Sequence, residues 1–149
     1  MNLNIQIDSL SFLNKLVQPS DTIRIIITTF PEDETQAISI ESKKIKETQP
    51  VFTFGISHLT KKIIAVFRKK NNFKKDYIFA STIIRSDQFP NKINDKYDSE
   101  VKVISLYEPF PSDSSHNHSL LENRGVIGRM EVRFALSGVS RSACSINKL

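Results

Sequence analysis

The chain has 149 residues, of which 39% are hydrophobic and 25% charged, and this balance excludes disorder throughout the chain. A length of this size predicts one domain. The single cysteine cannot form an internal disulfide, no apolar run is long enough to cross a bilayer, and the first residues lack the pattern of a secretion signal. We therefore expect a cytoplasmic protein, either free or associated with a membrane surface or the cytoskeleton.

Short runs rich in Ile, Val, Phe and Thr recur along the chain, and turn-forming residues separate nearly all of them. Their period-two alternation predicts β-strands. The pattern is clearest near the end, where alternate residues from Val126 to Leu136 are apolar or glycine and belong on one face. In chain order, the eight predicted strands are Leu3–Ile7, Thr22–Phe30, Ala37–Glu41, Val51–Ile56, Ile63–Phe67, Tyr77–Ile84, Val101–Tyr107 and Val126–Leu136.

Eight strands without a long helical pattern between them predict an all-β fold, an eight-stranded antiparallel β-sandwich or a barrel. A parallel sheet would need crossover helices, for which the chain has little room. Only Ser9–Val17 and Leu120–Asn123 look helical, and both would be connections. We assign residues 1–138 to the domain and expect 139–149 to form a flexible tail.

Positive charge is concentrated between Lys61 and Asp76. This window holds seven Lys or Arg and one acidic residue, a local balance of +6, whereas the whole chain carries +5 and the remainder therefore about −1. We expect the basic part of the window to be a loop between the strands Ile63–Phe67 and Tyr77–Ile84. A negatively charged partner would meet the protein at this loop.

Three motifs, in this order, resemble those of a C2 domain, a β-sandwich found in many membrane-associated proteins. Residues 20–23 (Ser-Asp-Thr-Ile) stand where the family has Ser-Asp-Pro-Tyr. Residues 49–54 (Gln-Pro-Val-Phe-Thr-Phe) are similar to its Asn-Pro-aromatic signature followed by Phe-x-Phe, and residues 75–79 (Lys-Asp-Tyr-Ile-Phe) to its Asp-Asp-aromatic-Ile-Gly. The resemblance runs from Leu3 to Leu136, and the terminal strands are similar to the circularly permuted, type II topology.

The chain departs from this family where calcium would bind. Calcium-binding C2 domains use about five Asp carboxylates on two loops, because Ca²⁺ needs six to eight oxygen ligands. Of these, the resemblance leaves only Asp21 and Asp76, and it implies that no metal or other cofactor is held there. The remaining positions fall on Lys15, Arg68, Lys70 and Lys75.

A loop that is already basic needs no metal to approach an anionic lipid surface, to which each Lys or Arg contributes about 1 kcal/mol. Leu16 and Val17 on the neighbouring loop are candidates to assist in the headgroup region. The predicted lipid- or anion-binding residues are Lys15, Arg68, Lys69, Lys70, Phe73, Lys74 and Lys75. The resemblance also implies a secondary basic cluster, where some C2 domains bind phosphoinositides, at Lys43, Lys44, Lys46, Lys61 and Lys62.

Simpler interpretations of the same residues stay open. The basic window is also compatible with a solvated turn, Phe73 with a side chain folded back on the sandwich, and the Lys43 group with an exposed edge that discourages aggregation. The pair His116 and His118 lacks the further ligands of a metal site, and Cys144 lacks a nearby activating group. With no recognised catalytic motif in the chain, we expect no enzymatic activity.

The resemblance leaves two functions open. One is calcium-independent docking on anionic phospholipid, and the other is a protein-interaction or scaffold module of the kind used in cytoskeletal and ciliary assemblies. Nucleic acid is disfavoured as a partner, because the basic window has few aromatic residues for base stacking and no binding motif. The sequence does not specify the lipid headgroup, the protein partner or the oligomeric state.

Overall fold

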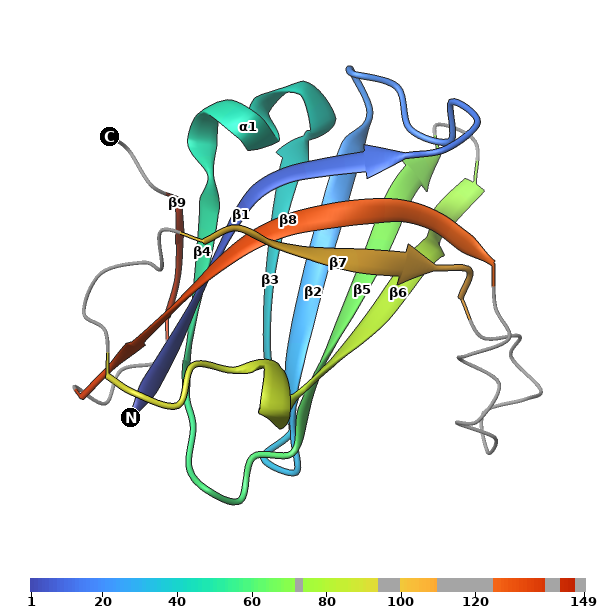
Figure 1. The fold of residues 1–149 in the computed structure, drawn as a ribbon. Helices are drawn as coiled ribbons and strands as arrows, with labels where there is room; N and C mark the ends of the chain where they lie inside the picture. The colour runs from blue at the N-terminus through green and yellow to red at the C-terminus, as the bar shows by residue number, and fades with distance from the viewer. Residues whose placement is uncertain (72–73, 94–99, 110–124, 139–142, 147–149) are drawn as a thin grey trace.

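Two facing layers of antiparallel strands enclose the core (Figure 1). The computed structural model describes residues 1–71, 74–93, 100–109, 125–138 and 143–146. One layer has the order β3-β2-β5-β6 and the other β7-β8-β1-β4-β9, and a single register pair, Ser81 with Tyr107, joins β6 to β7. The strands are β1 (Asn2–Phe12), β2 (Thr22–Phe30), β3 (Glu34–Glu41), β4 (Pro50–Gly55), β5 (Lys62–Asn71), β6 (Lys74–Arg85), β7 (Lys102–Tyr107), β8 (Val126–Ser137) and β9 (Ala143–Ile146).

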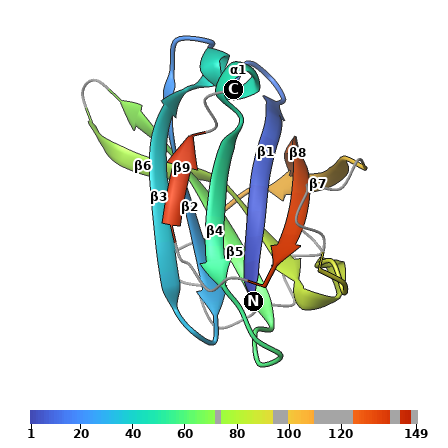
Figure 2. The same cartoon turned by 90° about the vertical axis from the view of Figure 1, so that its left-hand side faces the viewer.

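The predicted all-β, C2-like sandwich is confirmed, with one strand more than the eight expected. The additional strand, β9, lies within the segment 139–149 that the sequence analysis assigned to a tail. It pairs antiparallel with β4, from Pro50 to Thr53, and lies beside β3 at the other end of the strand order (Figure 2). Its four residues are too few to show a period-two pattern. The domain boundary at residue 138 stays a prediction.

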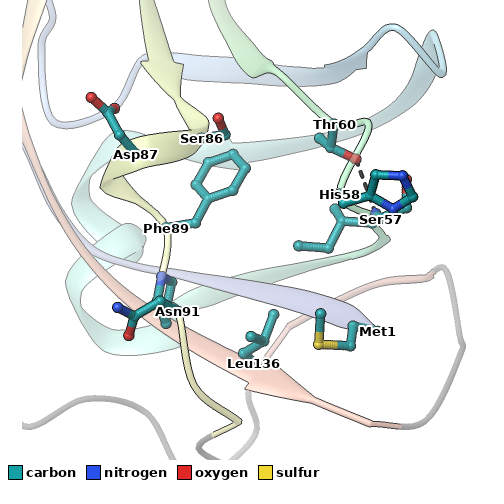
Figure 3. A pocket seen from close by; sticks show the side chains of 11 residues that line it. Met1, Ser57, His58, Thr60, Ser86, Asp87, Phe89, Asn91 and Leu136 are labelled. Carbon is teal, nitrogen blue, oxygen red and sulfur yellow. Dashed lines mark hydrogen bonds between the residues drawn. The ribbon is translucent and has the colours of Figure 1, made fainter.

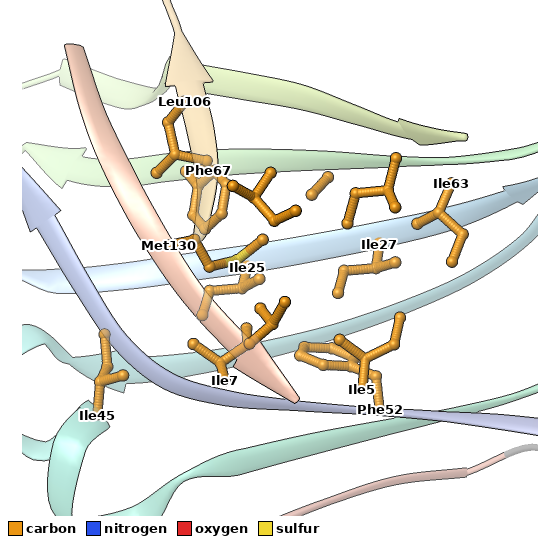
Figure 4. Packing of buried hydrophobic residues seen from close by; sticks show 14 of the residues in the cluster. Ile5, Ile7, Ile25, Ile27, Ile45, Phe52, Ile63, Phe67, Leu106 and Met130 are labelled. Carbon is orange, nitrogen blue, oxygen red and sulfur yellow. The ribbon is translucent and has the colours of Figure 1, made fainter. Parts of the chain in front are cut away.

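The alternation of side chains along the strands explains the core (Figure 4). In β2, Ile23, Ile25 and Ile27 are buried while the residues between them face outward. The predicted apolar face of β8 is likewise buried, except for Val126, which is 46% exposed at the strand's first residue. Each fully buried Ile or Phe contributes about 1.5–3 kcal/mol. The largest buried side chains are Phe52, Phe54, Phe67, Phe134, Leu3, Ile5, Ile7, Ile23, Ile25, Ile27, Ile45 and Ile63.

The predicted helix at Ser9–Val17 is wrong. Strand β1 continues through Ser9 to Phe12 after a register shift between Ile7 and Ser9, and Leu10 and Phe12 pack against the core. The chain then turns at residues 14–15, where φ values of 56° and 54° are left-handed and end the strand. Leu10, Leu13 and Leu16 are three residues apart in the sequence, and this spacing is also typical of one face of a helix. The other predicted helix, Leu120–Asn123, lies outside the described residues.

Three short helical segments were not predicted, because they are too short to show a helical period. They are η1 (Ser42–Lys44), α1 (Ile45–Thr48) and η2 (Ser86–Gln88). Ile45 is 2% exposed and anchors α1 on the core, and Gln49 ends the helix in a left-handed conformation. No helix in the described ranges has the length and apolar character needed to span a bilayer.

The basic segment is a strand hairpin and not the predicted loop. Strand β5 extends to Asn71 and β6 begins at Lys74, with Lys69 opposite Tyr77 in register. On its other side, β5 stays paired with β2 through Lys69. Basic residues are compatible with these strands because they stand at the end of the layer, where long side chains can reach water.

Gly128 makes a close contact that any side chain would disrupt. It lies opposite Phe12 in the β1–β8 pair, and a Cβ atom there would lie 2.5 Å from the Ser11 carbonyl oxygen and 2.8 Å from Phe12 Cδ1. Replacing Gly128 with Ala should therefore lower the free energy of unfolding by about 1–3 kcal/mol, measured by chemical denaturation. The control is Gly125→Ala, whose nearest neighbour is Glu108 Oε1 at 3.6 Å. Equal stability of the two variants would contradict this packing.

Candidate functional site

Three segments that are separate in sequence meet at one end of the sandwich. The loop 13–21 joins β1 to β2, and η1 begins against it, since the Ser42 and Lys43 backbone N–H groups donate to the carbonyl oxygens of Asp21 (2.8 Å) and Pro19 (3.0 Å). The end of β5 meets the same loop, because Lys69 Nζ donates to the Leu16 carbonyl oxygen at 2.9 Å. We call this region the basic end; its cationic residues are Lys15, Lys43, Lys44, Lys46, Arg68, Lys69, Lys70, Lys74 and Lys75.

Lys69 and Asp21 form the ion pair that holds this end together. Lys69 Nζ lies 3.0 Å from Asp21 Oδ2, and the two side chains are only 19% and 23% exposed. The same carboxylate oxygen accepts a hydrogen bond from the Gln18 backbone N–H at 2.7 Å. This backbone donor, followed by Lys69, lowers the pKa of Asp21, while burial opposes the shift. The Lys69 ammonium is therefore already paired within the protein, where it fixes the loop 13–21 against β5.

Arg68 faces the opposite side of β5, next to a residue that the sequence analysis missed. It lies directly across the ladder from Arg24 of β2, and its Nη2 donates to the Asp76 carbonyl oxygen at 3.2 Å. Its Nε is buried without a hydrogen-bond partner in the described part of the chain. Arg24 is exposed and is the only charged residue within the apolar run of β2, a signal that could have been noticed.

A concavity of about 340 Å³ opens beside Arg24 on the outer face of the β3-β2-β5-β6 layer. Two hydroxyl groups, one guanidinium and one carboxylate line it. Guanidinium and hydroxyl groups are donors suited to a phosphate or carboxylate oxygen. The lining residues are Thr22, Arg24, Ser39 and Asp76.

The other predicted residues of the basic window differ in how they are placed. Lys15 is exposed at the left-handed turn, as a surface cation should be. Lys70, Lys74 and Lys75 have backbone positions on the two hairpin strands next to the turn. Phe73 lies outside the described residues.

The apolar side chains that reach solvent at this end are not the predicted ones. Leu16 and Val17 pack against the core. Leu13, two residues from Lys15, is 55% exposed, and Tyr77, opposite Lys69, is 43% exposed. The sequence pattern could not distinguish the leucine that turns outward from its neighbours that turn inward.

The predicted secondary cluster does not exist as one group. Lys43, Lys44 and Lys46 are exposed on η1 and α1 at the basic end. Lys61 and Lys62 lie at the opposite end of β5, since Lys62 pairs with Phe30 whereas Lys69, near the other end of the strand, pairs with Ile23. The length of β5 separates the two groups of lysines, which their sequence positions alone do not reveal.

Two acidic residues offset part of the basic end. Glu41 lies 3.5 Å from Lys43 and 3.9 Å from Lys44, measured between carboxylate oxygen and Nζ. Asp21 is paired with Lys69. Exposed pairs such as those of Glu41 contribute about 0–1 kcal/mol and are easily exchanged for an external anion. Lys15 and Lys46 have no acidic partner within the described ranges.

Asp21 already has a cationic neighbour, the Lys69 ammonium. Asp21 Oδ2 and the Leu16 carbonyl oxygen already face the Lys69 ammonium. At 4 Å and an effective dielectric near 20, a second cation would be repelled by roughly 4 kcal/mol for each unit of its charge. Within the described ranges, no three His, Cys, Asp or Glu side chains are grouped closely enough to hold a metal ion.

Comparison with known proteins identifies the fold. No known family profile and no curated protein matches the sequence. Among solved structures, the chain is similar to a structure of CC2D1B, described as coordinating ESCRT-III activity during mitotic reformation of the nuclear envelope. The TM-score is 0.55 at 11% sequence identity. The match covers 91% of this chain and 54% of the CC2D1B chain, so this chain spans about half the length of the CC2D1B chain. The likeness shows a shared C2-like fold, and membership of the C2 family stays a prediction.

The lowered pKa of Asp21 predicts how its contribution depends on pH. A carboxylate whose pKa falls on folding stabilises the protein above its ordinary pKa, 3.8, and loses this effect as the pH falls through the lowered native value. Asp21→Asn should therefore lower the free energy of unfolding by about 1–3 kcal/mol at pH 7, and the deficit should shrink below about pH 4.

The control for this measurement is Asp33→Asn in the exposed β2–β3 turn, where φ is 60° and Asn is well tolerated. It should show little change in denaturation midpoint across the same pH range. A deficit for Asp21→Asn that stays constant from pH 7 to pH 2 would contradict the assignment.

Proposed function

We propose that this chain is a non-enzymatic, C2-like module that docks peripherally on anionic phospholipid membranes through its basic end, without calcium. The observation that carries this proposal is the meeting of three lysine-bearing segments at one end of the sandwich. The backbone hydrogen bonds from η1 and the Lys69 contacts gather cations that are up to 60 residues apart in the sequence. Several of these positive charges can then attract a flat, negatively charged partner at the same time.

The number of cations is sufficient for reversible docking. Lys15 and Lys46 are exposed, Lys70 is near the end of β5, and Lys74 and Lys75 begin β6. At about 1 kcal/mol for each cation close to an anionic leaflet, five such residues provide on the order of 5 kcal/mol. Because this attraction is screened within a Debye length, binding should weaken as salt is added.

Exposed apolar side chains at the same end support a membrane partner. Leu13 and Tyr77 stand beside the cations and are 55% and 43% exposed. A leucine and an amphipathic tyrosine are suited to the boundary between headgroups and acyl chains. The concavity beside Arg24 would face a lipid phosphate or headgroup on the adjoining face.

Calcium independence follows in this proposal from Lys69. In calcium-dependent relatives of the fold, a metal neutralises acidic loops so that they can approach lipid. Here the Lys69 ammonium lies against Asp21 and the Leu16 carbonyl oxygen. A side chain of the protein, in place of a metal ion, therefore neutralises the Asp21 carboxylate. Chelators should therefore have no effect on docking.

Liposome flotation tests the proposal. Combined replacement of Lys15, Lys46, Lys70 and Lys74 with Glu removes at least about 4 kcal/mol of attraction and should weaken binding to acidic liposomes roughly 1,000-fold. Lys69 is left intact in this variant because it holds the loop. Wild-type binding should fall with added salt and should be the same with calcium and with chelator.

The control reverses the two lysines at the opposite end, Lys61→Glu and Lys62→Glu, with half the change in net charge, and should retain binding. Normal binding by the fourfold variant, or equal losses in the two variants, would contradict docking through the basic end. Equal flotation with neutral and acidic liposomes would contradict it as well.

A protein-interaction or scaffold role is the second candidate. CC2D1B, which shares the fold, is described as coordinating ESCRT-III activity, and the arginine-lined concavity would also accept an acidic side chain of a partner. In that case acidic liposomes would not bind, and Arg24→Ala would release a partner captured from cell extract by the wild type. Lys61→Ala is the control for charge alone.

A further inference from the structure

The opposite end of the sandwich carries a second cavity, of about 490 Å³, which the proposed function does not use. It lies where the beginning of β1, the turn 56–60 and the η2 segment meet (Figure 3). Binding sites for small ligands usually have volumes of about 300–1,000 Å³ and are already formed in the free protein. This cavity therefore needs an account of its own.

Hydrogen bonds hold the walls of the cavity in place. The Ile56 backbone N–H donates to the Met1 carbonyl oxygen at 2.8 Å, and within the turn the Ser57 backbone N–H donates to Thr60 Oγ1 at 3.1 Å. Thr60 in turn donates to the Glu32 carboxylate of the neighbouring β2–β3 turn. On the other side, the Ser86 backbone N–H donates to the Lys61 carbonyl oxygen at 2.9 Å. A site fixed in this way loses little entropy when a ligand binds.

The lining combines an apolar interior with a polar rim. Phe89 projects from η2 toward the turn 56–60, and Met1 and Leu136 lie below it (Figure 3). Asp87 and His58 stand on opposite sides of the opening. Neither has a hydrogen-bond or ion-pair partner among the residues that the structure describes.

Three exposed apolar residues lie within or next in sequence to the segments that form the cavity. Leu59, within the turn, and Ile93, after the η2 segment, are each 58% exposed, and Met1 is 51% exposed. Ile93 reaches the chain just beyond Leu136, since a Cβ atom at Gly138 would lie 3.9 Å from Ile93 Cδ1. Large apolar residues gathered around a cavity with a polar rim mark sites of protein interaction.

The charge of the lining indicates the chemistry of the partner. Among the described residues that line the cavity, Asp87 is the only one with a carboxylate side chain, and none is Lys or Arg. The cationic neighbours in sequence, Lys61, Arg85 and Lys92, are not among the lining residues. A partner group beside Asp87 should therefore carry positive charge, and the group inside the cavity should be apolar.

We propose that this cavity binds a short peptide segment of a partner protein, with one large apolar side chain between Phe89 and Leu136 and an adjacent Lys or Arg beside Asp87. The volume accommodates an aromatic or branched side chain, and the exposed Leu59 and Ile93 would cover the flanking peptide. Because this site and the basic end lie at opposite ends, membrane docking and peptide binding would be compatible in one molecule.

The test uses the full chain, labelled with ¹⁵N, and the acetylated tetrapeptide amide Gly-Arg-Phe-Gly as the probe. Saturable amide shifts are expected for the turn 56–60 and for residues 86–91, at peptide concentrations up to a few millimolar. Replacing Arg with Glu in the probe should weaken binding at least threefold, and replacing Phe with Ser should abolish it. Asp87→Asn should weaken binding of the Arg peptide about threefold and leave the Glu peptide no weaker.

Asp33→Asn is the matched control, because Asp33 is an exposed acidic residue of the adjacent β2–β3 turn that does not line the cavity. Asn91→Trp, at an exposed lining position, should block the cavity while thermal unfolding stays unchanged. The proposal would be overturned if the peptide caused no amide shifts, or if Asp87→Asn and Asp33→Asn changed peptide binding equally. It would also be overturned if the amide shifts depended on protein concentration alone, as expected for binding of a second copy of this chain. Liposome flotation of Asp87→Asn should match the wild type, which separates this site from the basic end.

Discussion

The ion pair between Lys69 and Asp21 is the contact on which the position of the loop 13–21 at the basic end depends. One ammonium group bridges the Asp21 carboxylate and the Leu16 carbonyl oxygen, and so fixes the loop 13–21 to the end of β5. The first turn of η1 then rests on that loop through the backbone oxygens of Asp21 and Pro19. Hydrogen bonds to charged groups contribute about 1.5–3 kcal/mol each. The sheet itself also holds the cations of β5 near those of η1, because β2 pairs with Glu41 through Thr22 and with Lys69 through Ile23. The ion pair adds the position of the loop 13–21.

The two ends of the sandwich differ in chemistry. The basic end presents exposed lysines with Leu13 and Tyr77 beside them, which suits a broad anionic surface. The other end presents a preformed cavity with Asp87 at its rim, which suits a small apolar group next to a cation. Strands that run the length of the molecule keep these surfaces apart. The proposals for the two ends rest on different residues, so an experiment can contradict one of them without affecting the other.

Period-two patterns were sufficient to predict the fold class and most strands, because buried and exposed faces alternate strictly in strands such as β2 and β8. The same rule failed where charge and strand structure coincide. Lys69 and its neighbours continue β5 because backbone pairing with β2 does not depend on side-chain polarity. The separation of Lys62 from Lys43, and the position of Arg24 beside Arg68, depend on register, which the sequence does not specify. In β1, the register shift after Ile7 interrupts the period-two pattern, since Leu10 and Phe12 follow Ile5 and Ile7 on the core side.

The central proposal is that the Lys69 ammonium, which lies against Asp21 and the Leu16 carbonyl oxygen, makes a calcium ion unnecessary at the basic end. The most direct measurement follows the amide and Lys69 side-chain resonances of the ¹⁵N-labelled protein while calcium is added to millimolar concentration. The account predicts no saturable shift in the loop 13–21 or in the β5–β6 hairpin. A saturable shift centred on Asp21 and Asp76, with loss of the Lys69 contact, would contradict it.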